Sequence, residues 1–487
     1  MSNKSRTPLL CLCFALLSQL ASPPACLAND LAARKAKQEA DVWAQGQAVA
    51  QSVLLPVMVD SAFYITDFGA SPKADAVRNA QAINNAIDAA NAAGGGKVVV
   101  PYGQWLTGAI TLKSHVNLFL ESGATLLFST NRNHYLPIVR TRWEGLDCYN
   151  LRPLIYANGA TDIAITGEGT IDGQASNENW WYSCGSARFG WKEGMLRTDN
   201  KNDFTGRPLL GKMETEKVDV EKRRMGVIDA LRPQLINFFE CERCLIEGVT
   251  LRNSPFWVIH PCFVTNLTVR DVSVVSHGPN SDGCDPECSS NVLIDNCFFD
   301  TGDDCIAIKS GRNNDGRAID RRSENIVVRN CTMRNGHGGV VIGSEITSGC
   351  RNVWVFDCNM DSPELERVIR IKTNTCRGGV VENVFVKNVN VGQCKEAVLK
   401  INLDYWPREV CDRSYPPIVR NVLLQNVVSQ KSKYGVMTIG LPDLVNIQDI
   451  KLVDCKFNGV AEGNSIKGKV SGLSSTNLFI NGEKVTF

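Results

Sequence analysis

Four short motifs place acidic, imidazole and basic side chains at nearly regular intervals along this chain. In order, they carry Asp282, Asp303, Asp304, His337, Arg370 and Lys372. The steps from Asp282 to Asp303, on to His337 and on to Arg370 are 21, 34 and 33 residues long. If each step is one turn of a stacked coil, the six side chains meet on one surface. Carboxyl groups beside basic side chains suit acid–base cleavage of an anionic sugar chain.

A strand-like unit recurs along the same stretch and predicts such coils. Copies that open on Asn and continue with alternating apolar residues begin at Asn291, Asn325, Asn352, Asn383 and Asn421. Looser copies begin at Arg243, Asn266 and Asp449, so that the starts lie 23 to 38 residues apart. A repeat of this period indicates a solenoid, and no unit contains a helical crossover. We therefore predict an all-β fold, a right-handed parallel β-helix solenoid with about three strands in each coil.

Aligning the copies predicts how the chemical groups meet. Asp303 and His337 occupy the same position in successive units, so they should lie one above the other in adjacent coils. In the strand that follows, Ile371 should face the core and Arg370 and Lys372 should both face outward, because side chains alternate along a strand. Gly302 should permit a kink that turns Asp303 and Asp304 to the same side.

The four motifs together resemble glycoside hydrolase family 28, the polygalacturonases. They read Asn280-Ser281-Asp282, Gly302-Asp303-Asp304, Gly336-His337-Gly338 and Arg370-Ile371-Lys372. Ser281 stands where the family usually has Thr. Further family-like segments include Asp67-Phe68-Gly69-Ala70 and Gly167 to Gly173, and the resemblance extends roughly over residues 62 to 460. Each motif alone is weak, but four in order on a coil repeat form a specific signature.

The resemblance implies hydrolysis of α-1,4-linked galacturonic acid with inversion at the anomeric carbon. Asp303 would be the general acid, Asp282 and Asp304 would hold and deprotonate the attacking water, and His337 would tune the cluster. Three close carboxyl groups cannot all ionise easily, so one pKa should rise. We expect no cofactor and no metal.

Substrate recognition is expected from a second group of side chains. Arg370 and Lys372 would bind a substrate carboxylate, and Tyr405 resembles a substrate-contacting tyrosine of the family. Residues 184–232 interrupt the repeat within a catalytic domain of residues 61–487, and they carry several cations: Arg188, Lys192, Arg197, Lys201 and Arg207. This insertion would wall off one end of the groove, which favours exo action on pectin, polygalacturonate or its oligomers.

Two other functions fit part of this pattern. A pectate-lyase-like enzyme would use Ca²⁺ on the carboxylates and a basic proton acceptor. A non-catalytic β-helix adhesin would keep the coils without needing the acid cluster. Structural explanations also exist for other candidates: Lys309 is interpreted as structural, and Trp180, Trp181, Trp257 and His260 can pack in the protein as well as contact sugar.

The charge balance of the chain and its first residues predict which partners and which compartment to expect. The chain has 52 basic and 51 acidic residues and a net charge of +1, so no nucleic-acid surface is expected. Residues 1–28 resemble a cleavable signal peptide whose apolar run is too short for a membrane span. Residues 29–60 are predicted to be helical or a linker, and residues 76–93 an amphipathic helix that caps the first coil. We expect a secreted or periplasmic monomer.

The 19 cysteines fall into two groups. Cys297, Cys331 and Cys358 occupy the repeat position where other units have Val389 and Val427, so we interpret them as small buried hydrophobic residues. Cys284 and Cys288, four residues apart beside Asp282, are candidates for a disulfide, while a zinc site there lacks a second pair of ligands.

Overall fold

An asparagine ladder sets the register of the coils. Asn291, Asn325, Asn352, Asn383 and Asn421 all have left-handed backbone angles, with φ between 55° and 60°, which Asn adopts more readily than most residues. From Asn325 onward, each side-chain amide donates to the side-chain oxygen of the Asn in the preceding coil, over 2.7–3.2 Å. Strand pairing continues this column through the three looser copies, so all predicted units are coils.

The structure is a computed structural model that describes residues 40–202 and 204–487. Residues 46–487 form one compact unit. The predicted signal peptide, residues 1–28, lies outside the described residues. A helix ends at residue 52, and a stretch without regular structure leads to residue 61. Among the described helices, none combines the length and the apolar character needed to cross a membrane.

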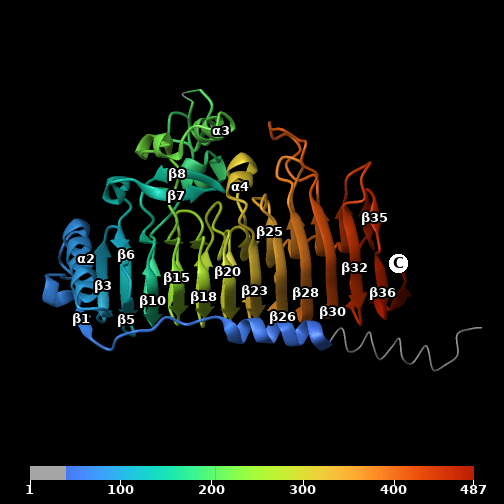
Figure 1. The fold of residues 1–487 in the computed structure, drawn as a ribbon, viewed down its shortest axis with the longest axis horizontal. Helices are drawn as coiled ribbons and strands as arrows, with labels where there is room; N and C mark the ends of the chain where they lie inside the picture. Colours follow the sequence, from blue (N-terminus) through green and yellow to red (C-terminus); the bar gives the residue numbers. More distant parts are fainter. Residues whose placement is uncertain (1–39, 203) are drawn as a thin grey trace, which may run out of the picture. The chain divides into compact units, whose positions relative to one another are not determined.

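Three stacks of parallel strands form the solenoid, which confirms the predicted right-handed parallel β-helix (Figure 1). The first stack contains β1 (Ala62–Tyr64), β2 (Gly96–Val100), β5 (Val116–Leu120), β10 (Thr161–Gly167), β15 (Glu242–Glu247), β18 (Thr265–Arg270), β20 (Ser290–Asp295), β23 (Ser323–Arg329), β32 (Ile447–Val453), β35 (Val470–Ser471) and β36 (Ser474–Thr476). The longer strands β26 (Cys350–Met360), β28 (Val380–Val391) and β30 (Ile418–Ser429) run from the first stack into the second.

The second stack contains β3 (Gly103–Thr107), β6 (Ala124–Phe128), β11 (Thr170–Asp172), β16 (Thr250–Arg252), β19 (Ser273–Ser276), β21 (Phe298–Thr301), β24 (Thr332–Met333), β33 (Lys456–Phe457) and β37 (Leu478–Ile480), with β38 (Glu483–Val485) antiparallel at its end. The third stack contains β4 (Ile110–Thr111), β9 (Ile155–Asn158), β14 (Ile236–Phe239), β17 (Ile259–Cys262), β22 (Ile306–Ile308), β25 (Val340–Gly343), β27 (Arg367–Lys372), β29 (Ala397–Asn402), β31 (Tyr434–Ile439) and β34 (Ser465–Lys467).

The predicted capping helix closes the first coil. Helix α2 (Ala76–Ala92) begins where the Asp75 carboxylate accepts a hydrogen bond from the Arg78 amide at 2.9 Å, a standard N-cap. Its buried face, which includes Ile83 and Ile87, packs into the same apolar core as the first strands. The helix thus covers coil backbone that would otherwise be an exposed sheet edge.

Cysteines mostly pack in the core, as predicted for Cys297, Cys331 and Cys358, whose exposed fractions are at most 2%. The disulfide considered for Cys284 and Cys288 is wrong, because both are buried free thiols. Cys284 packs in the main apolar core and Cys288 in a smaller cluster with Phe239 and Phe263, where burial suits a thiol. The disulfide found in the described chain instead joins Cys376 and Cys411, which lie outside the repeat positions.

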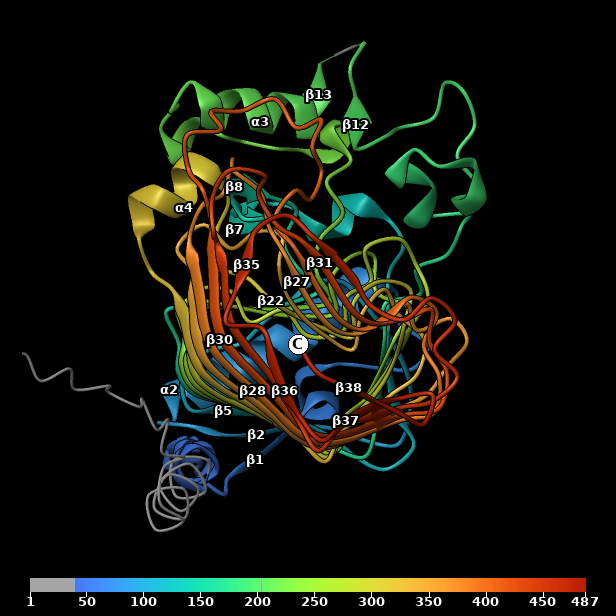
Figure 2. The same ribbon diagram turned by 90° about the vertical axis from the view of Figure 1, so that its right-hand side faces the viewer.

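Several excursions from the coils gather on the side of the third stack (Figure 2). The first excursion along the chain is the hairpin of β7 (Val139–Trp143) and β8 (Leu146–Asn150). The predicted insertion, residues 184–232, holds α3 (Arg207–Thr215), the short strands β12 (Asp199–Asn200) and β13 (Thr205–Gly206), and the 3-10 turns η4 (Ala187–Phe189), η5 (Val220–Lys222) and η6 (Val227–Asp229). Helix α4 (Asn313–Ile319) follows β22. Other 3-10 turns are η1 (Ile65–Phe68), η2 (Arg132–Tyr135) and η3 (Trp181–Cys184).

The ladder gives a direct test of what holds the coils in register. Asn352→Ala should lower the free energy of unfolding by about 2 kcal/mol, because it removes hydrogen bonds to Asn325 and Asn383 and strains a backbone with φ of 59°. Asn352→Gly removes the same bonds without the strain and should cost less. Thermal unfolding midpoints measure both, and equal midpoints for the two variants would contradict the strain contribution.

Candidate active site

The floor of the site is built by register between successive coils of the third stack. Ile306 pairs with Val340 and Val340 with Ile369, as the aligned repeats predicted. In the same register Val341 pairs with Arg370 and Gly343 with Lys372. Asp303 and Asp304 directly precede β22 (Ile306–Ile308), and Asp282 lies in the coil before. Four successive coils therefore deliver their side chains to one place.

Asp282, Asp303 and Asp304 converge, each with a carboxylate oxygen within 4.8 Å of the others. Asp304 is fully buried and Asp282 is 3% exposed, while the Asp303 side chain retains 17% exposure. Gly302 allows this through close approach, not a left-handed turn, since a Cβ there would lie 2.4 Å from the Gly278 carbonyl oxygen. The Ser281 hydroxyl lies 2.7 Å from the Ser276 and Gly278 carbonyl oxygens, a role that Thr could also fill.

His337 pairs with Asp303. Its Nδ1 lies 3.0 Å from the Asp303 Oδ1, so the two residues meet in adjacent coils as their alignment predicted. This hydrogen bond and the carboxylate charge raise the pKa of His337 to about 9. Burial alone would raise the pKa of Asp303, but the His337 hydrogen bond and charge outweigh it and hold that pKa below its usual range. In the unliganded protein, the pair is therefore an imidazolium and a carboxylate.

Asp304 is held by both cations of the last motif. Lys372 Nζ donates to Asp304 Oδ2 at 2.7 Å, and Arg370 Nη1 lies 3.4 Å from Asp304 Oδ1. Both cations point to the same side of β27 as predicted, but they are only 6% and 8% exposed. The Tyr405 ring lies beneath them, 5.3 Å from Lys372 Nζ and 5.5 Å from Arg370 Cζ.

Asp282 faces Lys309, the residue that was interpreted as structural from the sequence. Lys309 Nζ lies 3.6 Å from Asp282 Oδ2, 3.1 Å from Glu345 Oε2 and 4.8 Å from the centre of the Trp257 ring. Burial would lower the pKa of Lys309, but the carboxylates of Glu345 and Asp282 outweigh it and keep this amine charged.

The rise in pKa expected for one of the three carboxyl groups falls on Asp282. Burial is the main cause, followed by the negative charge of Asp303. Burial and neighbouring negative charge thus favour the protonated form of Asp282, whereas His337 favours the carboxylate form of Asp303.

A pocket of about 1120 Å³ opens over this cluster. Six of the seven candidate residues from the sequence line it: Asp282, Asp303, His337, Arg370, Lys372 and Tyr405. Asp304 lies behind them. Of the insertion's predicted cations, Lys201 and Arg207 line the pocket, and Trp257 is the one tryptophan of the three candidates that does so. His260 is fully buried against Glu287 at 2.9 Å, outside the pocket lining.

Sequence reasoning missed the charged residues that join the pocket walls. Five of them line the pocket: Glu144, Arg312, Glu345, Arg377 and Glu409. They lie on loops between coils, where the repeat carries no positional information. One feature of the sequence could have pointed to some of these residues. Charged residues stand directly after coil strands, as in Lys309 to Arg312 and Ser344-Glu345.

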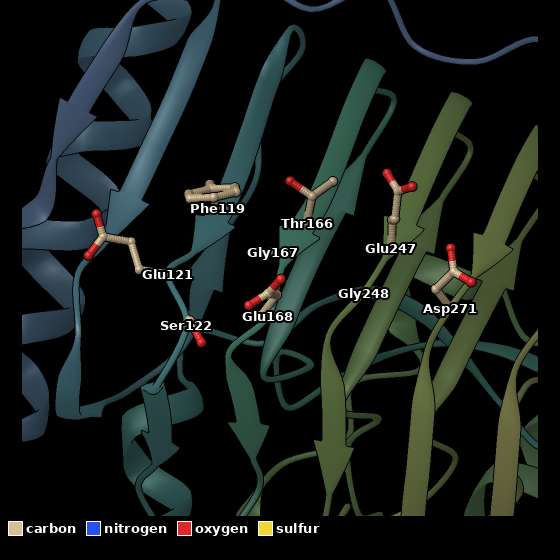
Figure 3. Close-up of a pocket in the computed structure, with 9 residues that line it drawn as sticks. All are labelled: Phe119, Glu121, Ser122, Thr166, Gly167, Glu168, Glu247, Gly248 and Asp271. Carbon is tan, nitrogen blue, oxygen red and sulfur yellow. The ribbon is translucent and has the colours of Figure 1, made fainter.

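A second hollow of about 630 Å³ lies along β5, β10 and β15 (Figure 3). Its lining includes Glu121, Glu168, Glu247 and Asp271 and contains no Lys, Arg or His. Because an anionic sugar needs basic partners, the larger pocket with its cations is the candidate active site.

Comparison with known proteins identifies the family of this chain. The sequence model described as glycosyl hydrolases family 28 matches residues 228–475. A hyperthermoactive exopolygalacturonase from Thermotoga maritima has the same fold, with a TM-score of 0.85, 37% identity and coverage of 91% of this chain and 96% of that one.

Two curated relatives extend the comparison. A probable polygalacturonase from Vitis vinifera is 28% identical over 72% of this chain, and the match spans 64% of that protein's length. The exo-poly-alpha-D-galacturonosidase of Dickeya chrysanthemi is 26% identical over 87% of this chain and 74% of its own. The protein belongs to family 28 of the glycosyl hydrolases.

The His337–Asp303 pair makes a titration prediction. In the parent protein, the His337 imidazole should titrate near pH 9, and in Asp303→Asn its pKa should fall toward about 6.5. Because the folded-state pKa is raised, the pair's contribution to stability is complete below about pH 6.5 and is lost as pH rises through about 9. NMR of ¹⁵N-labelled histidine measures both values, and an unchanged His337 pKa in the variant would contradict the pairing.

Proposed function

We propose that this protein hydrolyses α-1,4-linked galacturonic acid in pectin, polygalacturonate or its oligomers, and does so with inversion. The observation that carries this is the convergence of three carboxyl groups with His337, Arg370 and Lys372 in one pocket of a family 28 β-helix. The 37% identity with an exopolygalacturonase over nearly the whole fold supports the same substrate class.

Asp303 is the proton donor in this mechanism. It is the most exposed of the three carboxyl groups and lines the pocket, so it is the one best placed to reach a glycosidic oxygen. Without substrate, protonation is favoured at Asp282 and opposed at Asp303, so this mechanism has a proton pass to Asp303, whose carboxylate lies within 4.8 Å. The glycosidic oxygen, a hydrogen-bond acceptor, favours the protonated form of Asp303 once it arrives.

Asp282 then activates water, while Asp304, buried behind the pocket lining, holds Lys372 and Arg370 in place. Ionised Asp282, stabilised by Lys309, takes a proton from the water as its oxygen attacks the anomeric carbon and the bond to the leaving sugar breaks. Asp303 gives its proton to the departing oxygen. The cycle ends with Asp282 protonated and Asp303 ionised, which is the state described for the unliganded protein, so proton balance is maintained.

Arg370, Lys372 and Tyr405 are proposed to receive a substrate carboxylate. Without substrate, the two cations are paired with the fully buried Asp304. A uronate bound above them would share this positive charge, with Arg370 able to offer two parallel donors. No cofactor enters the mechanism.

The rival lyase and adhesin functions are weakened by how the cluster is neutralised. Four cationic side chains contact the three carboxylates: His337, Lys309, Arg370 and Lys372. A Ca²⁺ ion at this place would have to displace them. A surface that only binds sugar has no need of an acid buried with its proton.

We further propose that the enzyme is exported and acts as a monomer. The signal-like residues 1–28 support export, as does the Cys376–Cys411 disulfide, because such bonds persist in oxidising compartments.

Substitution of the donor tests the division of labour. Asp303→Asn should fold normally and lose about 10²–10⁴-fold in kcat on polygalacturonate. An aryl galacturonide with an acidic leaving group needs no proton donor, so it should restore turnover in Asp303→Asn but not in Asp282→Asn. Rescue of the Asp282 variant alone would transfer the donor role to Asp282.

Exo action is the finer part of the proposal, supported by the insertion that lines one side of the pocket. On polygalacturonate, reducing ends should accumulate while viscosity barely falls, and activity should survive EDTA. Products should be short saturated sugars without the absorbance of a 4,5-unsaturated end. A steep early fall in viscosity would mean endo cleavage, unsaturated products with Ca²⁺ dependence would mean a lyase, and no product would favour a binding protein.

A further inference from the structure

Three separate excursions of the chain attach to one short segment, residues 312–317, at the start of helix α4. This segment, here called the α4 hub, follows β22 and Lys309 directly, so it is continuous with the catalytic coil. The excursions are the β7–β8 hairpin, the insertion with α3, and the loop of residues 403–417.

The hairpin is attached at its tip and its second strand. Glu144, between β7 and β8, lies with Oε2 3.5 Å from Arg312 Nη1. The Asp147 backbone amide donates to Asp315 Oδ2 at 3.0 Å. Both contacts end on the α4 hub.

The insertion is attached at three points. Arg207, at the start of α3, donates to Glu144 Oε1 at 2.7 Å and so joins the hairpin tip. Further along α3, Glu214 accepts a hydrogen bond from the Asn314 amide at 2.7 Å. Beyond α3, Arg223 pairs with Asp315 at 2.6 Å.

The loop of residues 403–417 is attached through Glu409. Its Oε1 accepts from Arg312 Nη2 at 2.9 Å and from Arg377 Nη1 at 2.7 Å. Cys411 is linked to Cys376 only two residues further on. This loop carries Tyr405 into the pocket, so its anchorage places a proposed substrate contact.

The Arg223–Asp315 pair and the Glu409 carboxylate are shielded from water, whereas Arg207 is one-third exposed. The side chains of Glu409, Asp315 and Arg223 are 7%, 9% and 4% exposed. Although burial opposes it, Arg312 and Arg377 hold the pKa of Glu409 down to about 2. Leaving one partner of such a pair alone is far more disruptive than losing a surface ion pair.

We propose that the α4 hub is the positioning element that fixes the pocket walls over the catalytic coil, and that its ion pairs determine selectivity for chain ends. The ion pairs form a chain from one wall to the other, in which basic and acidic side chains alternate in the order Arg207, Glu144, Arg312, Glu409 and Arg377. This role rests on the proposed exo function, which the ion pairs of the α4 hub would enforce. Loss of a hub pair releases the walls, and an internal stretch of polymer can then enter.

Two substitutions test the hub from different sides. Glu144→Gln frees the hairpin and α3 from each other, and Asp315→Asn weakens the attachment of Arg223 and Asp147 without touching the pocket. In each variant, viscosity loss per reducing end should rise several-fold and products should shift to longer oligomers. KM for a galacturonate trimer should rise several-fold with little change in kcat, because the acid cluster is intact.

Glu382→Gln is the matched control, since it removes an ion pair with Arg420 on the large sheet away from the pocket. It should keep the parental product pattern. If either hub variant fails to fold, Asp315→Glu keeps the charge, displaces the carboxylate and should give the same shift. Parental products from folded hub variants would overturn the inference, whereas a parent enzyme that already cuts internally would overturn exo action itself.

Discussion

Three carboxyl groups within 4.8 Å of one another, in a largely buried place, are the constraint on which the rest of this structure depends. The carboxyl groups repel one another and have lost their hydration. This arrangement is stable only if a proton or a cation neutralises each group. The protein does so with one proton on Asp282 and with His337, Lys309, Lys372 and Arg370 from neighbouring coils. The solenoid supplies these partners because each coil adds one row of side chains to the same face.

The coil repeat therefore positions the catalytic side chains in a way that a single loop could not. Stacked coils hold donors and acceptors at a spacing set by backbone hydrogen bonds, which leaves little room for the cluster to relax. The Asn ladder fixes the register, and Gly302 lets the acidic segment approach its neighbour. Catalytic geometry is thus a property of the stack, while the shape of the pocket belongs to the loops.

This division explains how much the sequence could predict. The repeat revealed the fold and the alignment of Asp303 with His337, because these follow from the coil period and strand alternation. The capping helix followed from the helical spacing of apolar residues within residues 76–93. The contact of Lys309 with Glu345 could not be predicted because Glu345 lies on a loop outside the repeat. The bridging of Cys376 with Cys411, and the absence of a bond between Cys284 and Cys288, depend on where loops fold back. Arg312 and Glu409 met in space for the same reason, across about 100 residues of sequence that no local pattern connects.

The order in which the cations enter the chain has a consequence for synthesis. Asp304 precedes Arg370 and Lys372 by more than 60 residues, and β27, which bears them, is a later coil. A nascent chain that has emerged only as far as the His337 coil holds a carboxyl group that cannot yet be buried as an anion. The last catalytic coil should therefore stay open until β27 docks. Completion of the stack and burial of its innermost acid would then be a single event.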